Sequence, residues 1–219
     1  MSQLIFKFPF KAKYYEQDYY VSSNNFSAYR LIESWPDWPD KWVNIFGPNG
    51  SGKTHLSNIL KKKIPTAKIF EAKTLNDESI ISLKKFECVI IDNYNNNIEE
   101  KLLYSILNET RQLDNYVVIN SSSSIKNFKY DLKDLKSRAE SFFSLGIELP
   151  TDDLLRVIIT KYFSDKQINI SPKISEYIIK NIERSYEKIF KFIKEIDDLS
   201  LSSGKSININ LIKKVLTNE

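Results

Sequence analysis

The segment with the clearest chemical meaning is an eight-residue loop rich in glycine that ends in a lysine and a threonine. It runs Gly47-Pro-Asn-Gly-Ser-Gly-Lys53-Thr54 and matches the pattern Gly-x-x-x-x-Gly-Lys-Ser/Thr in full. Glycines let successive backbone N–H groups converge on phosphate oxygens, and a following helix adds its partial positive charge. The spacing predicts a phosphate-binding loop, with Lys53 on the terminal phosphates and Thr54 on a magnesium ion.

The neighbours of this loop are those that the motif requires. The apolar run Val43–Phe46 precedes it and the helical run His55–Lys62 follows it. A strand, a glycine-rich turn and a helix therefore follow in the expected order. The predicted nucleotide contacts within the loop are Gly47, Pro48, Asn49, Gly50, Ser51, Gly52, Lys53 and Thr54.

A second apolar run ends in the carboxylate that such a loop needs for its magnesium ion. A strand that ends in Asp is common, but the position of Val89-Ile-Ile-Asp92 after the loop favours Asp92 as a catalytic residue and, with Thr54, a magnesium ligand. Asn93 follows, where many hydrolytic P-loop enzymes have a second acid that orients the attacking water. We therefore expect weak ATPase activity at most from the chain by itself.

Other polar residues near these strands have a less certain chemical role. The strand Tyr116–Asn120 enters the polar turn Ser121–Ser124, which would lie beside the γ-phosphate if this strand neighbours the P-loop strand. Asn120 and Ser122 are the candidates there, although polar residues end most strands. His55 has no Ser, Cys or second His at a catalytic spacing, so its residue type indicates a structural role.

The first 150 residues alternate short β-rich runs with helical segments. Apolar strands that alternate with helices predict an α/β fold with a parallel sheet covered on both faces. Ile98–Leu113 has the clearest helical periodicity of apolar residues. The predicted strands are Val43–Phe46, Ala67–Phe70, Cys88–Asp92, Tyr116–Asn120 and Gly146–Leu149.

The strand signals vanish after Pro150, and four amphipathic helices follow. We therefore predict an N-terminal segment 1–10, an α/β nucleotide-binding domain 11–150 and an all-helical lid domain 151–219. The predicted lid helices are Asp152–Phe163, Lys173–Ile182, Tyr186–Leu199 and Asn208–Leu216.

Composition excludes several classes of protein. No run approaches 18 apolar residues, and residues 1–10 hold no signal-like apolar segment, so we expect a cytoplasmic protein without a membrane partner. The single cysteine, Cys88, cannot form an internal disulfide and is predicted to be a buried strand residue. Residues 151–219 hold 12 Lys and Arg against 10 Asp and Glu, and residues 1–150 hold 20 against 18. This even spread gives little support to direct binding of duplex DNA.

With these residues in place, the chain resembles the AAA+ ATPases of the DnaA family. It is most similar to the short members called Hda, the regulatory inactivators of the replication initiator DnaA. The likeness covers nearly the whole chain. The segments that carry it are Tyr20–Ala28, Trp35–Pro39, Gly47–His55, Leu135–Arg138 and Glu183–Arg184.

The resemblance implies an AAA+ P-loop NTPase core with a five-stranded parallel sheet, a small helical lid, and bound ADP or ATP with Mg²⁺. It places Val21 and Asn24 on the adenine side, His55 beside the phosphates, and Arg184, as the sensor II arginine, on the phosphates. Arg138 matches the arginine finger that acts on a neighbour's nucleotide. By residue type alone, both arginines are ordinary surface charges.

The N-terminal segment is similar to the sliding-clamp-binding motif of the inactivators. Its predicted contacts are Gln3, Leu4, Phe6 and Phe8, although six such residues also suit an edge strand or a disordered tail. The implied protein docks on the DNA polymerase III sliding clamp (β subunit), meets DNA indirectly through the clamp at the replisome, and presents Arg138 to ATP on DnaA. Head-to-tail contacts of this kind are also compatible with homodimers or oligomers.

Alternative functions remain open. The chain stops at Glu219 without room for the DNA-reading helix-turn-helix domain of the initiator, so we expect a regulator instead. Another DnaA-like adaptor, such as a helicase-loader-type ATPase, would share the core. A P-loop small-molecule kinase would need an additional acid or arginine cluster, which the sequence lacks. The turn Asn120–Ser124 also lacks the Asp that DnaA has nearby, so γ-phosphate sensing stays undecided.

Overall fold

The computed structural model describes residues 16–216, and these divide into two compact units. One unit contains the sheet and ends at Glu148, and the other is helical and begins at Leu149. Among residues 16–216, no helix combines the length and the apolar character needed to cross a lipid bilayer.

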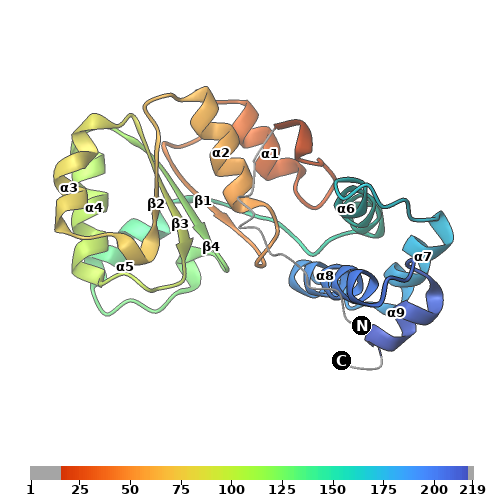
Figure 1. The fold of residues 1–219 in the computed structure, drawn as a ribbon. Helices are drawn as coiled ribbons and strands as arrows, with labels where there is room; N and C mark the ends of the chain where they lie inside the picture. The colour runs from red at the N-terminus through yellow and green to blue at the C-terminus, as the bar shows by residue number, and fades with distance from the viewer. Residues whose placement is uncertain (1–15, 217–219) are drawn as a thin grey trace. The chain divides into compact units, whose positions relative to one another are not determined.

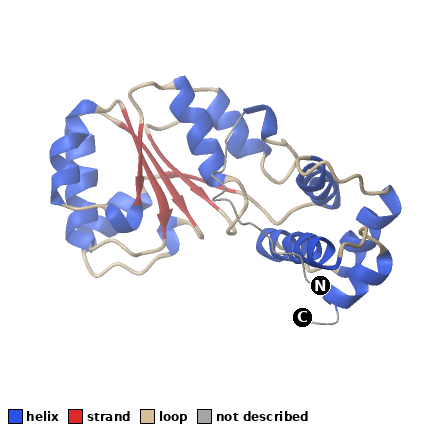
Figure 2. Ribbon diagram, viewed as in Figure 1, coloured by secondary structure: helices blue, strands red, loops and turns tan. Residues whose placement is uncertain are grey.

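The sheet unit is a five-stranded parallel sheet in the order β2-β3-β4-β1-β5 (Figures 1 and 2). This architecture confirms the predicted α/β class with its five-stranded parallel sheet. The strands are β1 Trp42–Phe46, β2 Lys68–Glu71, β3 Cys88–Tyr94, β4 Tyr116–Ser121 and β5 Phe143–Gly146.

Helices cover both faces of the sheet, with α1 and α2 on one face and α3, α4 and α5 on the other (Figure 1). Successive strand residues point to opposite faces, so β3 supplies Cys88 and Ile90 to one core and Val89 and Ile91 to the other. These helices are α1 Phe26–Glu33, α2 Lys53–Lys63, α3 Asp77–Ser82, α4 Glu100–Gln112 and α5 Lys133–Glu140.

The structure confirms that Cys88 is a buried strand residue. Burial, aided by the charge of Glu87, raises the pKa of its thiol to about 12.

The last strand is the clearest error of the sequence-based prediction. The strand is Phe143–Gly146, not Gly146–Leu149. The prediction followed the apolar residues Ile147 and Leu149, but β5 lies at the sheet edge and pairs only with β1. An edge strand tolerates exposed positions, and Phe143 is 36% exposed. The prediction also missed α1 and α3, which are short.

The helical unit consists of four helices around one apolar core. Its helix α8 ends at Gly204, which has a φ of 63° and closes the helix in the left-handed conformation. The predicted lid helices agree with the observed ones apart from their ends. The helices are α6 Asp152–Ser164, α7 Pro172–Asn181, α8 Tyr186–Ser203 and α9 Ile209–Leu216.

A buried asparagine joins β1 to the turn that follows β4. Asn44 is fully buried, and its Nδ2 donates to the backbone oxygen of Ile119 and to Oγ of Ser121, both at 2.8 Å. Its Oδ1 accepts from the backbone N–H of Ile125 at 3.0 Å. A buried amide with all three bonds satisfied holds this turn against the P-loop strand.

We expect Asn44→Ala to lower the free energy of unfolding of the sheet unit by about 1–3 kcal/mol, because the Ile125 N–H stays buried without an acceptor. Urea denaturation followed by tryptophan fluorescence measures the change. Asn127→Ala, at an exposed position of the same turn, is the matched control and should change stability by less than about 0.5 kcal/mol. Equal effects of both substitutions would contradict the assignment.

The helical unit contains a buried carboxylate with one cation. Asp197 on α8 is 1% exposed and forms an ion pair with Lys166, whose Nζ also donates to the Tyr162 hydroxyl at 3.1 Å. We expect Lys166→Met to destabilise the helical unit by about 1–3 kcal/mol, because removal of one partner leaves the other charge buried. Thermal unfolding followed by circular dichroism measures this, with Lys191→Met, from an exposed ion pair, as the control. An unchanged melting profile would contradict the expectation.

Candidate functional site

The P-loop connects β1 to α2 at the carboxyl edge of the sheet, and its glycines are required by close packing. A Cβ on Gly47 would lie 2.6 Å from the backbone oxygen of Ile147. Gly52 caps α2 with a φ of 95°, and a Cβ there would lie 2.9 Å from the Tyr19 ring. Larger residues at either position would therefore disturb the loop.

Lys53 begins α2 and folds back over the loop. Its ammonium donates to the backbone oxygens of Gly47 at 2.7 Å and Pro48 at 2.9 Å. The side chain is 7% exposed, and burial lowers the pKa of Lys53 to about 8, although the charge of Asp92 acts in the opposite direction. The cation is held by weak neutral acceptors that a phosphate oxygen could replace.

Thr54 and Asp92 lie together, as the predicted magnesium ligands should. The Thr54 hydroxyl donates to Oδ2 of Asp92 at 2.7 Å, and Asp92 is 4% exposed. Hydroxyl and carboxylate oxygens are the hard donors that Mg²⁺ prefers, and it usually takes its remaining ligands from water and phosphates. Within residues 16–216, no group of three or more His, Cys, Asp or Glu could hold a metal without such help.

Asn120 lies beneath this pair and is fully buried, not directed at a ligand. Its Nδ2 donates to Oδ1 of Asp92 at 2.8 Å and to Oγ of Ser57 at 2.7 Å. The strand that carries it, β4, neighbours the P-loop strand β1, which was the condition for its place near the loop. Asn120 therefore orients the Asp92 carboxylate. Ser122 is exposed, and its hydroxyl donates to Oδ1 of Asn95.

The segment assigned to the adenine side packs against α1 and α2. Tyr19 stacks on Tyr29 with ring centroids 5.7 Å apart and meets His55 edge-on at 5.3 Å. Asn24 is 5% exposed, and its Nδ2 donates to the backbone oxygen of Glu148 at 3.3 Å. Its side chain thus ties the segment to the residues that follow β5. Val21 is half-buried nearby in the sequence.

Arg138 lies in the last turn of α5, where Asn108 of α4 holds it. Its Nη2 donates to Oδ1 of Asn108 at 3.1 Å. Residues one turn further along both helices, Ser141 and Arg111, line a pocket at the amino edge of the sheet. Arg138 therefore lies toward the edge opposite to the P-loop.

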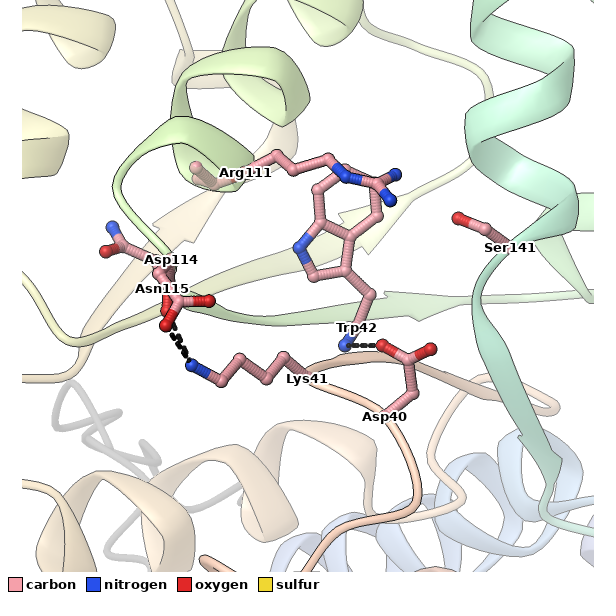
Figure 3. Close-up of a pocket in the computed structure, with 8 residues that line it drawn as sticks. Asp40, Lys41, Trp42, Arg111, Asp114, Asn115 and Ser141 are labelled. Carbon is pink, nitrogen blue, oxygen red and sulfur yellow. Dashed lines mark hydrogen bonds and ion pairs between the residues drawn. The ribbon is translucent and has the colours of Figure 1, made fainter.

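The pocket at the amino edge has a volume of about 220 Å³ (Figure 3). Its charged groups are largely engaged with their neighbours. Arg111 lies over the Trp42 ring at 5.6 Å, Lys41 pairs with Asp114 at 2.5 Å, and Asp40 accepts from the Trp42 N–H at 3.0 Å. These contacts cover the amino ends of the strands, and no sequence motif indicated them.

Arg184 belongs to the helical unit, where its guanidinium pairs with Asp152 at the start of α6. The Nη2 atom lies 3.0 Å and 3.1 Å from the two carboxylate oxygens. Both side chains are about half exposed, so the pair stabilises the unit little.

The remaining predicted contacts, Gln3, Leu4, Phe6 and Phe8, lie outside the described residues.

Sequence reasoning missed three polar residues near the predicted site residues. Glu71 and Asn95 bond to Asn93 and Ser122, and Asn108 bonds to Arg138. They come from separate elements and form no contiguous motif, so no sequence signal could have grouped them.

Comparison with known proteins points to one family. No family model matches the chain. The curated relatives include the replication initiator DnaA of Buchnera aphidicola, 25% identical over 99% of this chain and 53% of that protein. DnaA of Campylobacter jejuni is 26% identical over 80% of this chain and 44% of that protein. The chain thus spans about half the length of the curated relatives that it matches.

Solved structures agree on the fold. Domain III of Thermotoga maritima DnaA superposes with a TM-score of 0.77 at 16% identity, over 96% of this chain and 98% of that domain. AMPPCP-bound DnaA from Aquifex aeolicus gives 0.67 at 19% identity, over 87% of this chain and 67% of that one. The motor RuvB of Thermotoga maritima gives 0.62 at 21% identity, over 81% and 61%.

These matches do not separate the inactivators from other DnaA relatives. The distant sequence relationship and the shared five-stranded P-loop core identify this chain as a DnaA-like AAA+ protein.

Proposed function

We propose that this chain is an adenine-nucleotide-binding regulator of replication initiation. The P-loop supports nucleotide binding, because the Lys53 ammonium can exchange the backbone oxygens of Gly47 and Pro48 for phosphate oxygens. Thr54 and Asp92 would hold Mg²⁺, which neutralises phosphate charge when bound. AMPPCP is bound by solved DnaA structures that share this fold.

The chain is proposed to hold its nucleotide, preferentially ADP, with little hydrolysis. Asp92 is followed by Asn93, so β3 presents no second acid for an attacking water. Asn120 and Ser122 are bonded to Asp92 and Asn95, and this arrangement leaves few groups near the turn to read a γ-phosphate. We assign Arg184 a phosphate contact on family resemblance, since its exposed pair with Asp152 is weak enough to exchange.

The position of Arg138 carries the proposal that the chain acts on another protein. Because Arg138 lies toward the edge opposite to the P-loop, it supports a role at a nucleotide bound by a neighbour. An arginine supplied in trans stabilises the charge of the phosphoryl-transfer transition state and accelerates hydrolysis by about 10³–10⁵. The neighbour is proposed to be ATP-bound DnaA, met on the DNA-loaded sliding clamp through Gln3, Leu4, Phe6 and Phe8.

A second candidate is the nucleotide-binding part of an initiator. The curated relatives reported above are themselves DnaA proteins, and this observation favours the reading. The two functions differ in their partner, because a clamp-docked regulator requires the sliding clamp and an initiator does not.

The protonation of Lys53 predicts that nucleotide affinity falls in mild alkali. The ammonium form binds phosphate, and its pKa of about 8 means that the charge is lost as the pH rises through that value. ADP affinity should fall by about eightfold between pH 7.5 and 9. Isothermal titration calorimetry measures this. Lys61→Ala, exposed on the same helix, should keep the wild-type slope, whereas Lys53→Ala should lose binding. Constant wild-type affinity over this range would contradict the assignment.

The test of the proposed function is hydrolysis of DnaA-bound ATP in the presence of DNA-loaded clamp and this protein. Arg138→Ala should reduce stimulation by about 10³ or more, because the transition-state charge loses its cation. Gln3→Ala with Phe8→Ala should abolish clamp binding and stimulation together. Arg156→Ala, from an exposed pair with Asp153, is the matched control. Undiminished stimulation by Arg138→Ala would sink the proposal.

A further inference from the structure

The residue after Asp92 is an amide whose side chain is held toward a neighbouring strand. Asn93 has a φ of 58°, in the left-handed region that asparagine tolerates. Its backbone N–H donates to Oδ1 of Asp92 at 3.1 Å. Its side-chain Nδ2 donates to Oε2 of Glu71 at 3.0 Å. The backbone of Asn93 therefore belongs to the Asp92 site, while its amide is engaged elsewhere.

Glu71 is placed for this contact by the sheet register. It is the last residue of β2 and pairs with Asp92 of β3, so both acids lie at the carboxyl edge. Glu71 is half-buried, and Asn93 is exposed. Solvent therefore reaches this hydrogen bond, which makes it reversible.

A side-chain amide beside the magnesium carboxylate has a known chemical use. In P-loop GTPases a glutamine orients the water that attacks the γ-phosphate. We propose that Asn93 is the water-orienting residue of this chain's own site and that Glu71 acts as a latch that turns it away. The proposal rests on the proposed binding of ATP at the P-loop.

The reaction in question is ordinary hydrolysis. The water oxygen forms a bond to the γ-phosphorus, and the bond from that phosphorus to the bridging oxygen of ADP breaks. The released proton passes to phosphate and solvent, and the products are ADP and inorganic phosphate. Released Asn93 would align the water through its Oδ1 without taking the proton.

The size of the effect follows from the strength of the latch. One solvent-accessible hydrogen bond shifts a population by roughly two- to tenfold. Glu71→Ala should therefore raise the single-turnover rate of ATP hydrolysis by roughly that factor. Glu71→Gln keeps an acceptor for Nδ2 and should give a smaller gain. Glu78→Ala, an exposed acid on α3, is the matched control and should not change the rate.

The decisive variant combines both substitutions. Glu71→Ala with Asn93→Ala should lose the gain of Glu71→Ala, because the orienting amide is gone. A gain that persists in the double variant, an equal gain in Glu71→Gln, or no gain in Glu71→Ala would overturn the proposal. ATP binding is measured first for every variant by calorimetry. Wild-type protein that fails to bind ATP would instead refute the proposed nucleotide site, and equal melting temperatures exclude misfolding as the cause.

Discussion

The buried carboxylate of Asp92 is the constraint on which the site depends. A carboxylate removed from water is costly unless hydrogen bonds compensate for the lost hydration. Here they come from the Thr54 hydroxyl on α2, the Asn120 amide on β4 and the Asn93 backbone on β3. One charge thereby fixes the start of the P-loop helix relative to two strands, and the phosphate site is formed before any ligand binds.

Amide side chains perform much of this organisation. Asn44 and Asn120 are fully buried on adjacent strands, and each bonds to groups from other elements. A buried amide requires partners in defined directions, whereas apolar packing tolerates small shifts. The turn after β4 and the Asp92 carboxylate are held by such bonds. Rigidity at this edge of the sheet agrees with a chain that retains nucleotide and hydrolyses it slowly.

The two ends of the sheet differ in chemistry. The P-loop occupies the carboxyl edge, and Arg138 lies toward the amino edge beside a pocket whose charges are largely paired internally. A site at one edge and a cation at the other suit head-to-tail contacts, in which different surfaces of neighbouring molecules meet. The same separation prevents Arg138 from serving the chain's own phosphates.

The sequence by itself determined the P-loop, the parallel α/β fold and the run that ends in Asp92, because glycine spacing and apolar periodicity are local properties of the chain. It placed β5 three residues too late, since an edge strand need not be apolar and its bounds depend on pairing with β1. Only the tertiary structure decided the partners of the polar residues. Asn120 orients Asp92, Glu71 holds Asn93 and Asn108 holds Arg138, because strand register and helix packing bring these residues together across 22 to 30 positions of sequence.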